Sequence, residues 1–287
     1  MKRHFLAFFV LLFFAVLADG QDIRCNYKFW FKKVPDGKFT LVSDMRLDCF
    51  KGKSAWYSER DLVRDSLHFI AFDDSGHTAD QEAYGALTRS RASGIFSATT
   101  IDWDTHSFEQ HYQNSFLFLN GTGDLSLPEW LLSDEQKEIE GYVCKKASAR
   151  YLGRDWTVWY SEEIPLQAGP WLLWGAPGLI LEARDADELF VFKFTGAGPL
   201  ADGHRYDLLR TYFSTSRSQK KEKNYINDSI KNVEQTYTRL RTDVDFHDQA
   251  LGIKNARAIS ANGQELDRAA FMRYIPLIPT EYWKNQK

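Results

Sequence analysis

The chain has 287 residues, of which 44% are apolar, 15% are aromatic and 26% are charged. A collagen-like or disordered chain is excluded, because 18 glycines and 8 prolines are a modest share and the formal charge is only -3. A weakly acidic chain also lacks the clustered positive charge that binds nucleic acid, so no nucleic-acid partner is expected. The aromatic content favours a mainly β fold, because aromatic side chains pack well on pleated sheets.

The first 20 residues have the features of a secretory signal peptide. Lys2 and Arg3 give a positive start, residues 5–17 are apolar, and small residues precede a cleavage site after Gly20. The apolar run is shorter than the roughly 20 residues that span a bilayer, which makes an uncleaved anchor the weaker alternative. The sequence therefore predicts an exported protein that does not span the membrane. No repeat, linker or low-complexity tract divides residues 21–287, so we expect a single domain there.

A β-hairpin is predicted at the start of the mature chain. Apolar residues alternate with polar ones over 25–31 and again over 39–49, which is typical of half-buried strands. Pro35, Asp36 and Gly37 between the two runs suit a turn, because proline presets its φ and glycine accepts a positive one. If the turn centres on Gly37, the apolar faces of the two strands coincide.

The same register places Cys25 opposite Cys49. Opposed residues in a non-hydrogen-bonded antiparallel pair have Cα atoms about 4.5 Å apart, within the reach of a disulfide. Because exported proteins fold in an oxidising environment, we predict a Cys25–Cys49 disulfide. Two buried thiols, or a bond between one of these residues and Cys144, are the alternatives.

Most of the remaining chain is predicted to form strands. Two short helices are expected over 59–67 and 78–87, and Thr78 and Gln81 have the spacing of a capping box. Strand-like runs occupy 54–58, 95–103, 106–112, 116–119, 140–151, 156–160, 179–183 and 189–194. Few of the connections are long enough for helical crossovers, so we expect a curved antiparallel sheet or a partly open barrel.

A long amphipathic helix is predicted over 220–241, near the C-terminus. Five apolar residues recur there at the spacing of one helix face: Ile226, Ile230, Val233, Tyr237 and Leu240. We expect this face to cover the protein's own sheet. The alternative is a structural subunit that docks a partner protein through the helix.

The candidate metal ligands are Asp102, Asp104, His106 and His111. On an extended strand the first three would share one face, and transition metals bind carboxylate together with imidazole. The spacing matches no established ligand pattern, so we predict no resident metal and no other cofactor. A metal-binding protein or a metal-dependent hydrolase is the second hypothesis for function.

No catalytic residue is predicted. Glu162, Glu163 and Glu182 could serve hydrolysis only as a pair at a fixed separation, and adjacent glutamates on a strand point to opposite faces. Cys144 has no histidine beside it in the sequence to stabilise a thiolate, so an inert thiol is favoured. No serine lies in a nucleophile elbow.

Five segments in one order resemble the signature block of the GLPGLI family. They occupy 141–147, 153–160, 163–165, 169–171 and 175–182. The name motif reads Gly175-Ala176-Pro177-Gly178-Leu179-Ile180 here, and Ala176 stands where the family usually has leucine. The resemblance implies an exported, mostly β protein of the Bacteroidetes bacteria, in a family sometimes suggested to accompany outer-membrane transporters. It transfers no catalytic residue.

Two features of this block bear on function. Pro177 and Gly178 suit the central positions of a type II turn, which gives Gly175 and Gly178 a role in the backbone. Trp171 and Trp174 precede the turn and could line a ligand groove, with core packing as the alternative. The leading hypothesis is therefore an exported binding or accessory module, periplasmic or associated with the outer membrane. Its partner would be an outer-membrane transporter or another cell-envelope protein.

Overall fold

The computed structural model describes most of the chain after residue 21. The described residues are 22–32, 35, 37–50, 52–72, 77–90, 97–114, 117–200, 225–254, 257–260, 262–270, 272 and 274–284. The predicted signal peptide at 1–20 and the first residues of the predicted long helix, 220–224, lie outside them.

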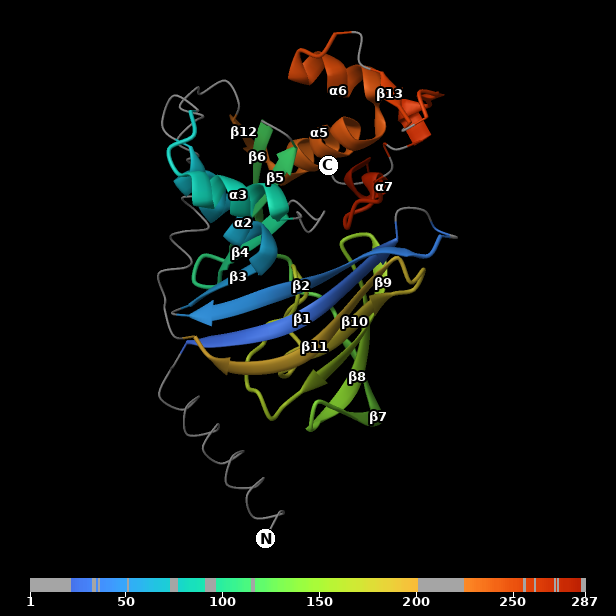
Figure 1. The fold of residues 1–287 in the computed structure, drawn as a ribbon. Helices are drawn as coiled ribbons and strands as arrows, with labels where there is room; N and C mark the ends of the chain where they lie inside the picture. The colour runs from blue at the N-terminus through green and yellow to red at the C-terminus, as the bar shows by residue number, and fades with distance from the viewer. Residues whose placement is uncertain are drawn as a thin grey trace.

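Twelve strands in the described part of the chain form one strongly curved sheet (Figure 1). They are β1 (Ile23–Lys32), β2 (Phe39–Phe50), β3 (Lys53–Ser58), β4 (Ser97–Asp102), β5 (Ser107–Asn114), β6 (Leu117–Asp124), β7 (Leu131–Ile139), β8 (Tyr142–Tyr151), β9 (Arg154–Ser161), β10 (Leu179–Asp185), β11 (Phe190–Pro199) and β12 (Tyr225–Ser229). A separate short ribbon pairs β13 (Ala258–Ile259) with β14 (Glu265–Leu266).

The order of strands across the sheet is β12-β6-β5-β4-β3-β2-β1-β11-β10-β9-β8-β7. All neighbours are antiparallel except β12, which runs parallel to β6. The expected mainly β fold with a curved sheet is therefore confirmed. The sheet is mixed rather than purely antiparallel, and it does not close into a barrel, because β12 and β7 are its two free edges.

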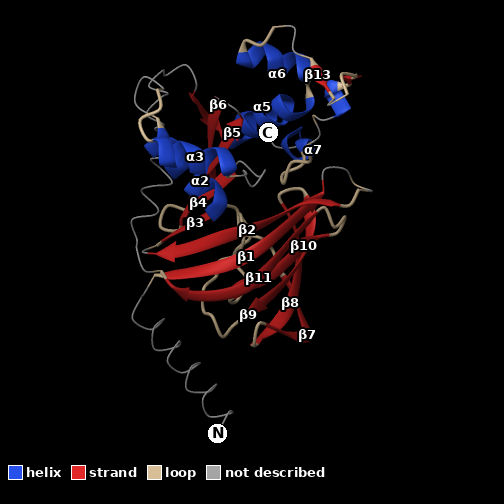
Figure 2. Cartoon of the chain, in the orientation of Figure 1, coloured by secondary structure: helices blue, strands red, loops and turns tan. Residues whose placement is uncertain are grey.

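Four of the five described helices gather at the part of the sheet formed by β3 to β6, and the last, α7 (Thr280–Lys284), lies beside the β8–β9 turn (Figure 2). The other four are α2 (Glu59–Ala71), α3 (Gln81–Arg89), α5 (Ile230–Thr242) and α6 (Val244–Leu251). The helices predicted at 59–67 and 78–87 are confirmed as α2 and α3. The cap of α3 is Asp80 rather than Thr78, and its side chain accepts the Ala83 N–H at 2.8 Å. No helix among the described residues has the length and apolar character needed to cross a membrane.

Most of the core lies on one face of the sheet and beneath the loop over 162–178. Every second residue of β1 from Ile23 to Phe29 is buried, as the alternating pattern predicts. The Tyr27 hydroxyl donates a hydrogen bond to the Ile180 carbonyl at 2.8 Å, which ties β1 to β10 through the core.

The predicted hairpin of β1 and β2 is confirmed, but its register differs by two residues. Cys25 lies opposite Leu47, and Cys49 lies opposite Ile23. All three cysteines, including Cys144, are buried free thiols, so the predicted Cys25–Cys49 disulfide is wrong. The physical reason is that alternation has a period of two, and a shift of two residues leaves every side chain on the same face.

The predicted helix over 220–241 is wrong over residues 225–229. This segment is β12, and α5 begins only after Ser229, whose hydroxyl accepts the Asn232 N–H. The apolar face of α5 packs on side chains of β5 and β6, including Tyr112 and Leu119, as we expected. Docking of a partner through this face is therefore contradicted. Ile226 fitted the helical spacing by chance, because one apolar residue satisfies either period.

Two glycines of β6 let α5 approach the sheet closely. A Cβ at Gly121 would lie 3.0 Å from the Ile230 Cα, and one at Gly123 would lie 2.9 Å from the Phe108 ring. Neither the helix backbone nor the buried ring can give way cheaply. Larger residues at these positions would lift α5 from the sheet.

Candidate functional site

A pocket opens at the end of the sheet where β1 begins and β2 ends. Because these strands are antiparallel, the start of β3, the end of β4 and the start of β5 lie at the same end. The loop over 162–178 completes the wall, and the pocket volume is about 560 Å³. We call it the tryptophan pocket; the residues that line it include Ile23, Cys49, Phe50, Lys53, Trp103, His106, Leu166, Gln167, Ala168 and Trp174.

The base of the tryptophan pocket is apolar, and two indoles form one wall. Ile23 and Cys49 are buried at the base. The ring centroids of Trp103 and Trp174 are 5.5 Å apart with 47° between the ring planes. The His106 ring lies 6.4 Å from that of Trp174. An apolar hollow with a few polar groups at its rim is typical of small-molecule sites.

Hydrogen bonds at both ends of the residue hold Trp174 in place. Its indole N–H donates to the Ser126 carbonyl at 3.1 Å, and its own carbonyl accepts the Trp130 indole N–H at 2.8 Å. The next residue, Gly175, has φ 79°. A Cβ there would lie 2.7 Å from the Leu127 Cδ1. The wall of the pocket is therefore fixed before any ligand binds.

Of the two tryptophans expected at a groove, the structure places only Trp174 in the pocket. Trp171 is 1% exposed and packs in the core, with its ring centroid 6.1 Å from that of Trp156. Trp103 also lines the pocket and was not predicted to do so. No local signal distinguishes it, because it lies in a turn whose position depends on the pairing of β4 with β5.

The name motif has a structural role, although its turn differs from the predicted one. Gly178 has φ 158°, whereas a type II turn requires about +80° at that position. The Gly178 N–H instead donates to the Ala176 carbonyl at 2.7 Å. A Cβ at Gly178 would lie 2.1 Å from the Ser161 carbonyl oxygen, so only glycine fits there. Ala176, Leu179 and Ile180 are buried.

Asp102 shapes the β4–β5 turn beside the pocket. One carboxylate oxygen accepts the N–H groups of Asp104 and Thr105 at 3.1 Å each, and the other pairs with the Lys53 ammonium. The hydrogen bond from Lys53 lowers the pKa of Asp102 to about 2. The Asp102 carboxylate is therefore charged, and both of its oxygens already have hydrogen-bond or ion-pair partners. His106 follows with φ 52° and directs its ring toward the Trp174 side of the pocket.

The structure does not bring the four candidate metal ligands together. A turn over 103–106 interrupts the strand that would have aligned Asp102, Asp104 and His106 on one face. His111 is buried on β5, where its Nδ1 lies 2.9 Å from the Asn120 Oδ1. Over the residues that the structure describes, no three His, Cys, Asp or Glu side chains are grouped so as to hold a metal ion.

The candidate groups for hydrolysis are separately engaged. Glu162 pairs with Lys145 at 2.9 Å, and Glu182 pairs with Lys137 at 2.9 Å. Glu163 accepts the Val143 N–H at 2.9 Å. Each carboxylate therefore has its own partner.

The third cysteine is equally unsuited to chemistry. Burial raises the pKa of the Cys144 thiol to about 12, so the thiol stays protonated at neutral pH. The thiol also lies within 3.5 Å of the Tyr142 carbonyl. The expectation of an inert thiol agrees with this environment.

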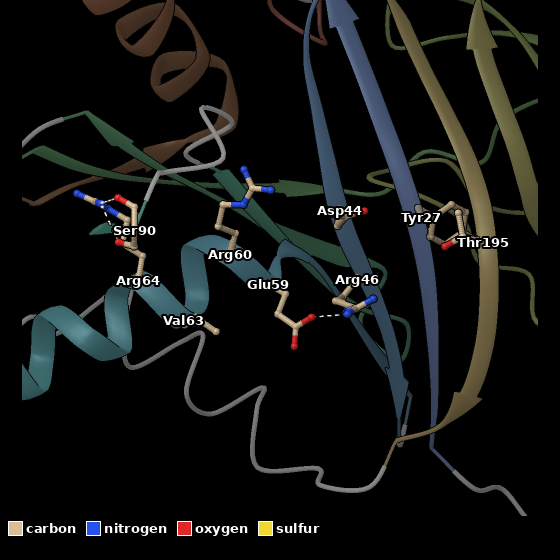
Figure 3. Close-up of a pocket in the computed structure, with 9 residues that line it drawn as sticks. All are labelled: Tyr27, Asp44, Arg46, Glu59, Arg60, Val63, Arg64, Ser90 and Thr195. Atoms are coloured by element: carbon tan, nitrogen blue, oxygen red, sulfur yellow. Dashed lines mark hydrogen bonds and ion pairs between the residues drawn. The ribbon is translucent and has the colours of Figure 1, made fainter. Parts of the chain in front are cut away.

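A second pocket, of about 630 Å³, lies between α2 and the strands β1, β2 and β11 (Figure 3). Three arginines contribute to its lining: Arg46 from β2, and Arg60 and Arg64 from α2. We call it the arginine pocket. It shares no lining residue with the tryptophan pocket.

Comparisons with known proteins leave the family open. No protein-family model and no curated protein matches the sequence. Among solved structures, PNGF-II has a TM-score of 0.47 and 16% identity, over 75% of this chain and 32% of its own. The chain thus spans about a third of PNGF-II. A LolA superfamily protein from Nitrosomonas europaea has a TM-score of 0.25 and 8% identity, over 64% of this chain and 87% of its own. Such low values do not identify a function.

Proposed function

We propose that the protein is an exported binding module whose small-molecule ligand occupies the tryptophan pocket. The observation that carries this proposal is the pair of indoles, 5.5 Å apart, beside a buried apolar base. Tryptophan rings bury a large area per residue and pack favourably on other flat rings. A volume of about 560 Å³ lies within the range of small-molecule pockets. The ligand we propose therefore has a flat apolar ring.

The polar rim gives the ligand its orientation. The side chains of His106 and Gln167 form no hydrogen bond with other residues in the described ranges, so their polar atoms are available to a ligand. The charge of Lys53 is balanced by Asp102. Asp22 also lines the pocket, so the pocket favours a ligand that is not negatively charged and carries hydrogen-bonding groups at one end.

The exported location and the accessory role are part of the same proposal. Residues 1–20 support export, and the GLPGLI-like block supports a partner among outer-membrane transporters. Mass spectrometry of the protein from fractionated native cells tests export: we expect a mature N-terminus at Gln21 in the envelope fraction. An affinity pull-down from the same cells tests the transporter. Intact Met1 in the cytoplasmic fraction would remove this part of the proposal.

Binding is tested with N-phenyl-1-naphthylamine, an uncharged aromatic molecule that fluoresces strongly in apolar surroundings. We expect saturable binding to the wild-type protein and at least tenfold weaker binding to Trp103→Ala, because a stacked ring contributes about 0.5–1.5 kcal/mol in addition to the apolar area it buries. Trp103 is the better site for this variant, since the Trp174 indole also donates a structural hydrogen bond to the Ser126 carbonyl.

The matched control is Trp30→Ala. Trp30 is partly exposed on β1, under the Lys193 ammonium, and does not line the tryptophan pocket. This variant is expected to bind the probe as the wild type does. Equal losses in the two variants, or no saturable binding at all, would rule out the tryptophan pocket as the ligand site.

A further inference from the structure

We infer that the arginine pocket is a separate binding site for an oxyanion, that is, a phosphate or carboxylate group on a small organic molecule. The pocket lies beside α2, has a volume of about 630 Å³, and has three arginines among its lining residues (Figure 3). This inference does not rest on the function proposed for the tryptophan pocket.

Arg46 forms the fixed side of the site. Its guanidinium forms an ion pair with Glu59 and donates a second hydrogen bond to the Asn26 side chain. These contacts hold the group against β1 and the first turn of α2. The Arg46 Nε is buried and has no hydrogen-bond partner within the described ranges, so one donor of this guanidinium is unused.

Arg60 and Arg64 form the opposite side, on α2. They are four residues apart and therefore lie on one helix face, one turn from each other. Arg64 donates to the carbonyl and hydroxyl oxygens of Ser90, at 3.1 and 3.2 Å. Both acceptors are neutral. Arg60 is exposed, and it forms no ion pair or hydrogen bond with the residues that the structure describes.

The carboxylates of the arginine pocket do not neutralise these two arginines. Glu59 is engaged by Arg46, and Asp44 lies 3.6 Å from the Lys28 ammonium. Like charges at this helical spacing destabilise a helix. An anion bound between Arg60 and Arg64 removes that repulsion and gains charge-assisted hydrogen bonds.

The chemistry of the ligand follows from the guanidinium groups. Their planar donors match the paired oxygens of carboxylate and phosphate groups, which is why arginine recognises both. Val63 lies between Arg60 and Arg64 in the sequence, lines the same pocket and is 52% exposed. It offers a contact for an apolar part of the ligand. Phenyl phosphate and benzoate combine the two features and distinguish the two anionic groups.

The test measures the affinity of the full mature chain for phenyl phosphate and for benzoate by calorimetry at low salt. We expect at least one of them to bind, and the tighter of the two identifies the natural anionic group. Binding is expected to weaken at least tenfold in the double variant Arg60→Gln/Arg64→Gln. It is also expected to weaken as salt is raised, since exposed charges are screened. Benzyl alcohol, which has the ring without the charge, is expected not to compete.

Arg89→Gln is the matched control, because Arg89 is an exposed arginine on the neighbouring α3 and lies outside the pocket. Trp103→Ala is the control for the other pocket. Both variants are expected to bind the anions as the wild type does. The thermal unfolding of the double variant is expected to be no lower than that of the wild type, which separates lost binding from lost folding. The inference is overturned if neither anion binds at millimolar concentration, or if a control variant loses as much affinity as the double variant.

Discussion

Arg154 and Asp185 form a buried ion pair, with 3.1 Å between Nη1 and Oδ2. The other two nitrogens of Arg154 donate to the carbonyls of Pro276 and Leu277 at 2.7 Å each. One guanidinium on β9 therefore holds the C-terminal segment over 274–284 against the end of the sheet.

Arg154→Ala is expected to lower the free energy of unfolding by about 3–5 kcal/mol, because it leaves the Asp185 carboxylate buried without its cation. The side chains of this pair are 7% and 1% exposed. Urea unfolding, followed by tryptophan fluorescence, measures the change. Arg150→Ala is the control: its partner Asp155 is 2.9 Å away, but the side chains are 69% and 61% exposed. A surface pair contributes little, so no resolvable change is expected there. Similar losses in both variants would refute the role given to Arg154.

Glu234 makes the stability of the α5 region depend on pH. It is 2% exposed, accepts a hydrogen bond from the Tyr112 hydroxyl, and has a second oxygen with no partner among the described residues. Burial raises its pKa from 4.5 to about 7. The folded state therefore favours the protonated acid. The contribution of the protonated Glu234 side chain to the free energy of unfolding is complete below pH 4.5 and is lost as pH rises through about 7.

Glu234→Gln removes this titration. Between pH 4.5 and pH 7, we expect the free energy of unfolding of the wild type to fall by on the order of 3 kcal/mol relative to that of the variant. This figure is the pKa shift of Glu234 converted to free energy. Urea unfolding at several pH values in this window measures the difference. Glu129→Gln, at an exposed position, is the control and should follow the wild type. A difference between wild type and Glu234→Gln that stays constant with pH would refute the assignment.

The cysteines are expected to be three unreactive thiols. Burial raises the pKa of Cys49 to about 12 and raises the pKa of Cys25 well above its usual range. An aromatic disulfide reagent at pH 8 should therefore detect almost no thiol in the folded protein and three thiols per chain in guanidinium chloride. A single thiol after unfolding would mean that two cysteines are joined in the native protein.

Gly178→Ala is expected to destabilise the protein by about 2 kcal/mol or more, because the new Cβ would lie 2.1 Å from the Ser161 carbonyl oxygen. The fixed β9 backbone cannot move away without disturbing the strand. Gly198→Ala on β11 is the control, since no atom lies within 4 Å of a Cβ there. Thermal unfolding should show a clear loss for the first variant and none for the second. Equal melting temperatures would show that the loop has room to adjust.

Much of the sheet could be predicted from the sequence, because a strand with one buried face must alternate apolar and polar residues. β7 could not, since it is an edge strand whose residues 133–138 are polar and whose Leu131 and Leu132 are exposed. Because β7 has no buried face, its sequence shows no alternation of apolar and polar residues. The register of β1 and β2 was missed because alternation cannot distinguish a shift of two residues.

The pockets were harder to predict, because they depend on where turns meet in space. Trp174 and His106 were singled out for different reasons, a groove and a metal site, and the fold places them in one pocket. Trp103 and the pair Arg60 and Arg64 carried no distinctive motif. Arg60 and Arg64 share a pocket with Arg46 because α2 packs on β2 and β3, and Trp103 lies beside Trp174 because of the β4–β5 turn. Both are tertiary features.

The most direct test of the proposed binding function uses the unaltered protein and the indole N–H signals of its tryptophans in a ¹H–¹⁵N NMR titration with N-phenyl-1-naphthylamine. Ring currents from a bound aromatic molecule shift only signals close to it. We expect saturable shifts of the Trp103 and Trp174 indoles, with the Trp30 and Trp283 indoles unchanged. Shifts at Trp30 or Trp283 without shifts at Trp103 and Trp174 would contradict the proposed site.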